Sequence, residues 1–203
     1  MVLLGGLFVL LNRGGNGITG IFSTAPPPPG FNFNLTNSSY EATVAGGNKQ
    51  AQSATAKQVG ATLRNSLDAV FTTAYLDQSA WGDTGNIEDS FTDDAKGHLK
   101  GDVDVLTLGS NAGDTYTFVK PEKSQLKATV LTAKDGTALR AVASVHFVAI
   151  ATHHDGTYSK ITVTGAYFFV KGNDGWKIEG YRLNKDEKPT KAPASATPSG
   201  ASS

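Results

Sequence analysis

Three glycine-containing turns separate four segments of alternating apolar and polar residues, and this pattern constrains the fold more than any other feature of the chain. The segments are rich in Val, Thr, Ile, Phe and Tyr, as strands are, and cover 125–132, 138–151, 158–170 and 175–183. The turns are Asp135-Gly136, Asp155-Gly156 and Asn173-Asp174-Gly175. Each supplies the positive φ that a tight hairpin needs. The sequence therefore predicts an antiparallel meander.

Helical spacing precedes the meander. From Gln50 to Asp77, apolar residues recur every three or four positions, which indicates a long amphipathic helix. Shorter helical patterns follow over 91–99, capped by Ser90 or Thr92, and over 103–108, and a short strand is expected over 115–119. Helices followed by a meander predict an α+β fold, with the long N-terminal helix and one or two short helices packed on one face of a curved sheet.

The two ends of the chain differ from this central part. Val2 to Leu11 is apolar but spans only about 15 Å as a helix, about half of a bilayer core, and Arg13 follows it. We expect residues 1–11 to be a partial membrane anchor or a signal remnant, and 12–48 to be a flexible linker rich in Gly, Pro, Asn and Ser. The folded domain is expected over 49–184 and a disordered tail over 185–203.

Composition excludes several functions. The 203 residues carry 18 basic and 18 acidic side chains, with no basic cluster to bind nucleic acid. The absence of Cys excludes disulfides, zinc–thiolate sites and Cys nucleophiles. Gly15, Gly17 and Gly20 match a dinucleotide fingerprint, but the prolines at 26–29 are incompatible with the helix that this site requires. His153 and His154 are adjacent and would point to opposite faces of a strand. No cofactor and no metal are predicted.

The last hairpin, AYFFVKGNDGWKIEGY over 166–181, resembles the nuclear transport factor 2-like superfamily, also described as SnoaL-like or as the cystatin-like cone. The resemblance extends over about 50–184 and implies a cone-shaped α+β fold, which hosts many unrelated functions. With the apolar N-terminal run and an Ala-rich first helix, the chain is more particularly similar to Mce-associated membrane proteins of actinobacterial envelopes. That likeness implies a non-enzymatic accessory factor of lipid-import complexes. Cone domains of conjugation and type IV secretion proteins share the same layout, in which a membrane anchor precedes the folded domain.

Cone folds enclose a pocket between the long helix and the concave sheet, and enzymes of the superfamily place a carboxylate base and Tyr or His donors there. His146 is the one catalytic candidate, although the apolar residues on both faces of its strand favour a covered core position. If Arg140 were buried, it would need a carboxylate partner, and Asp68 on the long helix is the candidate for that partner. The candidate ligand-binding residues are Tyr75, Trp81, His146, Tyr167 and Phe169. For the aromatic members of this set, a role in the core is the alternative.

The favoured hypothesis is a non-enzymatic accessory domain that is anchored to the cell membrane and extracytoplasmic, or secreted if the N-terminal segment is cleaved. It would bind an envelope protein complex or an apolar small molecule. One alternative is a small pocket enzyme of the isomerase or dehydratase type that uses His146. The other is a self-associating scaffold domain of a conjugation or secretion system, and a homo-oligomer is left open.

Overall fold

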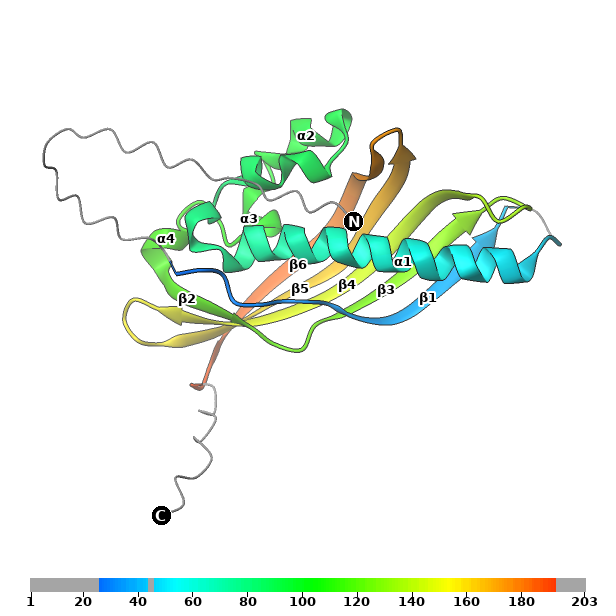
Figure 1. The fold of residues 1–203 in the computed structure, drawn as a ribbon. Coiled ribbons are helices and arrows are strands. Elements are labelled where there is room, and N and C mark those ends of the chain that lie inside the picture. Colours follow the sequence, from blue (N-terminus) through cyan, green and yellow to red (C-terminus); the bar gives the residue numbers. More distant parts are fainter. Residues whose placement is uncertain (1–25, 44–45, 193–203) are drawn as a thin grey trace, which may run out of the picture.

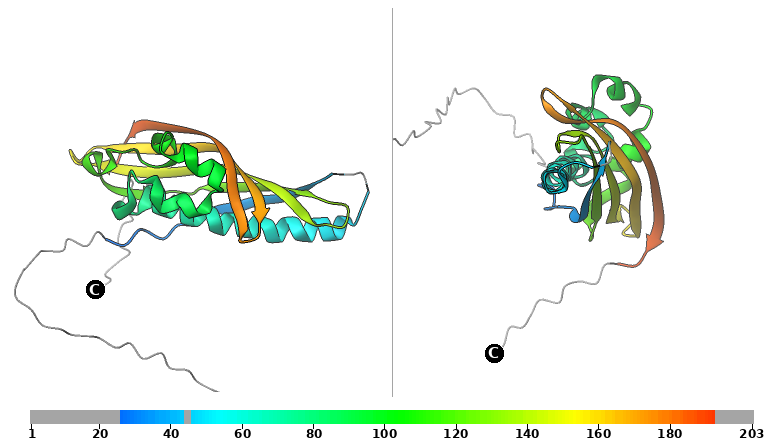
Figure 2. Two further views of the ribbon diagram at one scale, coloured as in Figure 1. Left: turned by 90° about the horizontal axis from the view of Figure 1, so that it is seen from above. Right: turned by 90° about the vertical axis from the view of Figure 1, so that its right-hand side faces the viewer.

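The computed structural model describes residues 26–43 and 46–192, which form a curved mixed sheet with helices on one side (Figures 1 and 2). The strands are β1 (Asn34–Ala42), β2 (Tyr116–Pro121), β3 (Gln125–Thr132), β4 (Ala138–His153), β5 (Tyr158–Gly172) and β6 (Gly175–Thr190). The helices are α1 (Lys49–Phe71), α2 (Asp93–Leu99), α3 (Val103–Leu106) and α4 (Ala112–Thr115). A π-helical turn, η1 (Thr72–Leu76), and two 3₁₀ segments, η2 (Gln78–Ala80) and η3 (Thr84–Ser90), connect α1 to α2. The predicted α+β class is confirmed.

The meander is present as predicted. Strands β3, β4, β5 and β6 are neighbours in chain order, and each pair is antiparallel. Gly136, Gly156 and Gly175 have φ values of 94°, 81° and 105°. Because L-residues with side chains rarely adopt such angles, these three glycines fix where the hairpins turn.

Two further strands make the sheet more complex than a meander. Strand β2 pairs with the second half of β4, beyond the end of β3, so that β2 and β3 follow each other along one edge of β4. Strand β1 pairs with β3 in parallel. A parallel pair needs a long crossover, and here the whole helical region supplies it.

The long helix begins and packs as its sequence predicts. Asn48 caps α1, its side-chain Oδ1 accepting a hydrogen bond from the backbone N–H of Ala51 at 3.0 Å. The predicted apolar stripe is buried against the sheet: Val59, Leu63, Leu67, Val70, Phe71, Ala74 and Tyr75. Thr92 caps α2, as expected. The helix therefore covers one face of the sheet only.

The expectation of a flexible linker over 12–48 is wrong for the part that forms β1. The polar composition of this segment conceals a strand, and α1 packs very closely against that strand. A Cβ on Gly60 of α1 would meet Ser38 Oγ at 2.2 Å. Just before β1, Phe33 is 2% exposed and packs edge-on against Phe71, with ring centroids 5.0 Å apart. The predicted anchor at 1–11 lies outside the described residues.

Asp68 on α1 holds the segment that leads into β1. Its Oδ1 accepts a hydrogen bond from the backbone N–H of Phe33 at 2.7 Å, and Arg64 lies 3.7 Å from its Oδ2. Burial raises the pKa of Asp68, and the hydrogen bond from Phe33 and the charge of Arg64 only partly offset this effect. The Asp68 carboxylate therefore accepts the hydrogen bond from Phe33 although burial disfavours its charged form.

We expect Asp68→Asn to keep the unfolding free energy at pH 7 within about 1 kcal/mol of wild type, because the amide oxygen still accepts from Phe33. Asp68→Leu leaves a buried N–H without a partner and should cost about 1–3 kcal/mol. Since the folded-state pKa is raised, the wild type should lose stability relative to Asp68→Asn as the pH rises above the ordinary value of 3.8. Urea unfolding of the three proteins at acidic and neutral pH measures both effects. Equal losses in the Asn and Leu variants would contradict this role.

The disordered tail predicted over 185–203 begins too early, because β6 continues to Thr190. Lys185 to Thr190 pair with Tyr158 to Val163 of β5, although no large apolar residue is present among them. Backbone hydrogen bonds hold this polar edge strand, and an edge position accommodates Pro189, which lacks an N–H. Residues 193–203 lie outside the described residues.

Candidate functional site

Aromatic side chains fill the space between α1 and the inner face of the sheet. Tyr75, Tyr167 and Phe169 are fully buried. Phe71 stacks on Tyr75 with ring centroids 5.2 Å apart, and Phe147 lies 5.1 Å from Tyr75. Hollows at the surface of the described domain are lined by other residues. The predicted pocket residues are therefore core residues here, which was the alternative that the sequence left open.

The hydroxyls of Tyr75 and Tyr167 are weak acids. The Tyr75 hydroxyl donates to the backbone oxygen of Val105 at 2.7 Å. The Tyr167 hydroxyl is buried and has no hydrogen-bond partner among the described residues. Burial raises the pKa of both groups well above the ordinary value of 10.0, because the phenolate would be desolvated. Neither hydroxyl is prepared to transfer a proton at neutral pH.

Trp81 lies at the edge of this core and is half-buried. Its Nε1 donates to the backbone oxygen of Tyr75 at 3.0 Å, and its ring meets Tyr116 edge-on at 6.4 Å. The structure thus brings Trp81 beside Tyr75 and leaves its indole N–H already bonded. Its contacts are those of a structural residue.

His146 does not join the aromatic residues. Its neighbours on β4, Val145 and Phe147, are buried on the inner face, so the His146 side chain is on the outer face, where it is exposed. Strand β4 is central, as predicted, but the described helices cover only one of its faces. The expectation that His146 shares a pocket with the tyrosines is therefore wrong. Arg140 is also exposed and pairs with Glu179 at 3.4 Å, not with Asp68.

A polar cluster that the sequence did not reveal lies where β2, β4, β5 and β6 meet. The Ser159 hydroxyl donates to Glu187 Oε1, and His153 Nε2 lies 2.9 Å from Ser159 Oγ. The Tyr116 hydroxyl donates to Glu187 Oε2 at 2.7 Å, and burial, reinforced by this hydrogen bond, raises the pKa of Tyr116. Past Leu183 the sequence has no alternation of apolar and polar residues that could have revealed this cluster, and Glu187 is in the segment expected to be disordered.

This cluster is not arranged as a catalytic triad. In a triad the carboxylate binds the imidazole nitrogen remote from the serine. Here Glu187 accepts from Ser159 itself and lies 3.5 Å from the same His153 nitrogen that contacts the serine. Ser159 is also only 4% exposed. The network ties the end of β6 to β4 and β5, which is a structural role.

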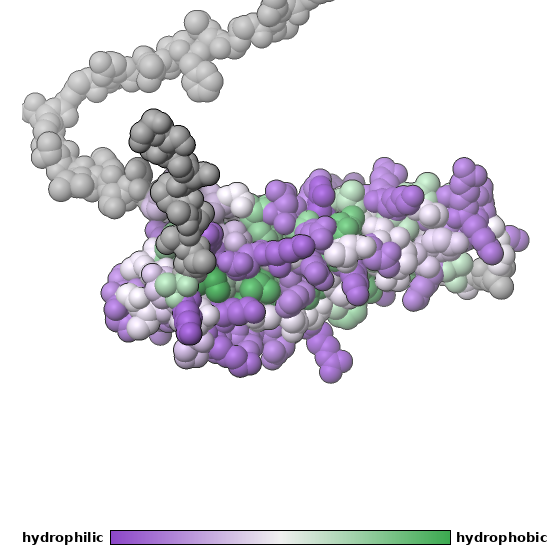
Figure 3. All heavy atoms as spheres, turned by 90° about the horizontal axis from the view of Figure 1, so that it is seen from below, coloured by the Kyte–Doolittle hydropathy of each residue, from purple (hydrophilic) through white to green (hydrophobic). Residues whose placement is uncertain are grey.

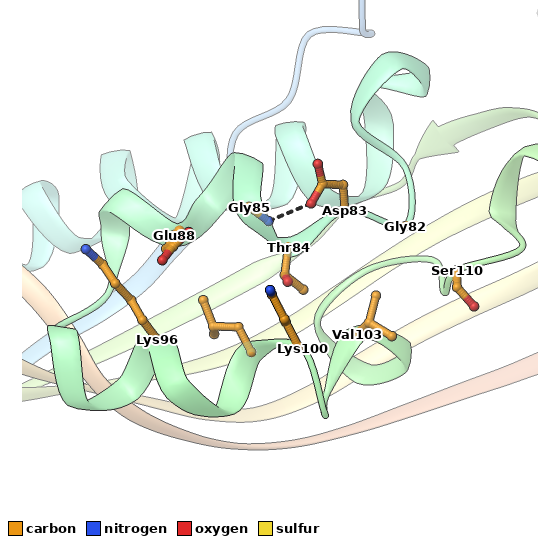
Figure 4. A pocket seen from close by; sticks show the side chains of 10 residues that line it. Gly82, Asp83, Thr84, Gly85, Glu88, Lys96, Lys100, Val103 and Ser110 are labelled. Atoms are coloured by element: carbon orange, nitrogen blue, oxygen red, sulfur yellow. Dashed lines mark hydrogen bonds between the residues drawn. The ribbon is translucent and has the colours of Figure 1, made fainter.

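A polar hollow of about 270 Å³ opens on the helical side, between η3 and α2 (Figure 4). It is lined by Gly82, Asp83, Thr84, Gly85, Glu88, Lys96, Leu99, Lys100, Val103 and Ser110. Two of its four charged side chains, Asp83 and Lys96, already have partners. Asp83 accepts from the backbone N–H of Gly85 at 2.8 Å, and Lys96 lies 3.1 Å from Asp93, whose hydrogen bond raises the lysine pKa. These groups act as a helix cap and a surface ion pair, and they present no reactive combination.

Residues that the structure describes form two hollows on the outer face of the sheet. The first, the Phe168 hollow, has about 250 Å³ and is lined by Glu41, Thr129, Leu131, Arg140, Ala141, Val142, Phe168 and Glu179. The second, the lysine hollow, has about 430 Å³ and is lined by Lys120, Glu122, Val148, Ile150, Lys160, Thr190 and Lys191. Seen from below, hydrophobic residues reach the surface among hydrophilic ones (Figure 3). Phe118 and Phe168 are exposed, and the alternation of buried and exposed residues along β2 and β5 places both on the outer face of the sheet.

Within 26–43 and 46–192, no group of three or more His, Asp or Glu side chains is placed to hold a metal ion. Over the same ranges, no helix combines the length and the apolar character needed to cross a bilayer.

Comparisons with known proteins leave the family open. No protein-family model matches the chain, and no curated protein matches it. Among solved structures, a putative aromatic ring hydroxylase from Novosphingobium aromaticivorans aligns with 52% of this chain and 78% of its own length, at 15% identity and a TM-score of 0.35. A likeness at that level assigns neither family nor activity. The resemblance to the nuclear transport factor 2-like superfamily stays a prediction, whereas the α+β fold is established.

Proposed function

We propose that this chain is a non-catalytic accessory domain, tethered to a membrane on its extracytoplasmic side, that binds a protein partner in an envelope complex. The observation that carries the proposal is the closed interior, in which Tyr75, Tyr167 and Phe169 are fully buried. Because these buried rings fill the space between α1 and the sheet, the surface is the part of the described domain that is open to a partner. The tether and the location rest on the apolar run from Val2 to Leu11. An Mce-associated role would place the partner in a lipid-import complex.

The Phe168 hollow is the surface that best fits a protein partner. Phe168 is 38% exposed, and Leu131 and Val142 are half-buried around it. The ion pair between Arg140 and Glu179 borders these apolar residues. An apolar centre with a polar rim is the usual anatomy of a protein interface. The expected occupant is a partner protein that inserts an aliphatic or aromatic side chain.

Site-specific photo-crosslinking in the host envelope tests this proposal. A photoreactive phenylalanine at position 168 should crosslink to one defined partner, whereas the same group at Gln58, exposed on α1, should not. Val142→Asp should reduce the crosslinked yield about tenfold or more, because it places a charge in the centre of the interface. His146→Asp, an exposed position on the same face of β4, is the matched control and should leave the yield unchanged.

Other results would contradict the proposal. A crosslinked product made of two copies of this chain would favour the scaffold alternative. A yield that is equal at positions 168 and 58 would argue against the Phe168 hollow. Native mass spectrometry before and after organic extraction tests whether the interior of the domain holds an apolar ligand. An extractable mass bound to the folded chain would show that the aromatic core opens to hold an apolar ligand.

A further inference from the structure

Three lysines occupy one cross-strand row on the outer face of the sheet. Lys120 on β2 pairs with Ile150 on β4, and Ile150 pairs with Lys160 on β5. Lys160 in turn lies directly opposite Lys188 on β6. Like charges in directly opposed positions destabilise a sheet. Asp186 compensates Lys188 at 2.7 Å, but among the described residues no ion pair is formed by Lys120 or Lys160. The fold thus carries uncompensated positive charge at a cost.

The row crosses the lysine hollow, whose floor is apolar. Val148 and Ile150 supply aliphatic side chains, and Lys191 adds a further cation to the rim. Glu122 is the one carboxylate among the residues that line the hollow. Lysines surrounding an aliphatic floor form an amphipathic surface with an excess of positive charge.

The next row along the sheet adds aromatic rings. Phe118 on β2 pairs with Thr152 on β4, which pairs with Tyr158 on β5. The Phe118 side chain is 41% exposed, and Tyr158 is half-buried. A large exposed apolar ring beside unpaired lysines is costly in water and suited to an interface that offers both anionic and apolar groups.

We propose that the lysine hollow, together with Phe118 and Tyr158, rests on an anionic phospholipid surface. Lipid phosphates complement Lys120, Lys160 and Lys191, and the apolar boundary beneath them accepts the exposed ring. A free phosphate would leave Phe118 in water. Nucleic acid is disfavoured by the balanced charge of the whole chain and by the absence of Arg from the row.

This surface is separate from the Phe168 hollow. Val142 and Ile150 lie eight residues apart on β4, which corresponds to roughly 26 Å. One face of the sheet can therefore contact a membrane at one end and a protein at the other. The lipid proposal does not depend on the protein partner, and either can fail alone.

A site-specific fluorescent probe on the full chain tests the proposal. Because the chain has no Cys, Thr190→Cys gives a single labelling position at the lysine hollow, and Gln58→Cys gives a control on α1. The environment-sensitive dye NBD at position 190 should shift to the blue with vesicles of equal parts phosphatidylglycerol and phosphatidylcholine, and not with phosphatidylcholine alone. The dye at position 58 should not respond. Both proteins keep residues 1–11, so binding through that segment cannot produce the difference.

Charge variants show whether the lysines are responsible. Lys120→Gln with Lys160→Gln should raise the lipid concentration for half response about 25-fold, since each lysine near an anionic surface contributes about fivefold. The double variant Lys57→Gln with Lys127→Gln removes the same charge from α1 and β3, outside the lysine hollow. It should leave the lipid concentration for half response unchanged. The first pair should also be at least as stable as wild type, because it relieves like-charge repulsion.

Three results would overturn the proposal. The first is a position 190 probe that does not respond while the full chain sediments with anionic vesicles. The second is a response that survives Lys120→Gln with Lys160→Gln. The third is an equal response to inorganic phosphate or to a single-stranded oligonucleotide, which would assign the surface to a soluble anion or to nucleic acid.

Discussion

Gly165→Ala is expected to lower the free energy of unfolding by about 3 kcal/mol or more. Gly165 lies in the middle of β5 with φ +141°, a conformation that L side chains rarely adopt. An added Cβ would meet the backbone oxygen of Arg182 at 2.1 Å and the Cα of Leu183 at 2.9 Å. Because both contacts are to the β6 backbone, a change of side-chain rotamer cannot relieve them.

Urea and thermal unfolding followed by circular dichroism measure this loss, which corresponds to a fall of about 10 °C in Tm. Gly180→Ala is the matched control, since Gly180 is in β6 and its added Cβ would have no atom within 4 Å. It should change the unfolding free energy by no more than about 0.5 kcal/mol. A Gly165→Ala protein as stable as wild type would mean that β5 and β6 do not approach each other this closely.

Near the turn between β5 and β6, β6 also contacts the helical region. Ile178 of β6 forms a bridge with Phe91, and the backbone N–H of Thr92 donates to the Ile178 oxygen at 2.9 Å. These contacts attach the start of α2 to the far end of the hairpin. The curl of β5 and β6 around the helices is visible in Figure 2. A flatter sheet would separate the short helices from the edge strand.

The sequence predicted the parts of the fold that depend on local chemistry. Three Gly turns determined the hairpins, and the spacing from Val59 to Tyr75 determined α1. Strand β1 and the end of β6 escaped detection because their stability comes from partners remote in sequence. Asn34–Ala42 and Lys185–Thr190 carry few apolar residues, yet ladder hydrogen bonds to β3 and β5 hold them.

The candidate site was harder to predict than the fold, because it depends on which face each side chain occupies. Tyr75, Tyr167 and Phe169 were predicted as candidate ligand-binding residues, but the sequence could not show whether they line a space or fill it. His146 was misplaced because Val142, Val148 and Ile150 made its face of β4 look covered. The same apolar residues line the two outer hollows that we propose as binding surfaces.

Phe33→Ala is expected to cost about 3–5 kcal/mol, which would be a large share of the stability of a domain of this size. The ring is 2% exposed, and its centroid lies 4.9 Å from that of Phe31, 5.0 Å from Phe71 and 6.4 Å from Phe147. Truncation would leave a cavity between α1 and β4 and would loosen the segment leading into β1. If 12–48 were only a linker, the same substitution would have no effect on unfolding. Asn32→Ala, an exposed neighbour, is the control, and urea unfolding of both variants distinguishes a strand that completes the sheet from a spacer that merely precedes it.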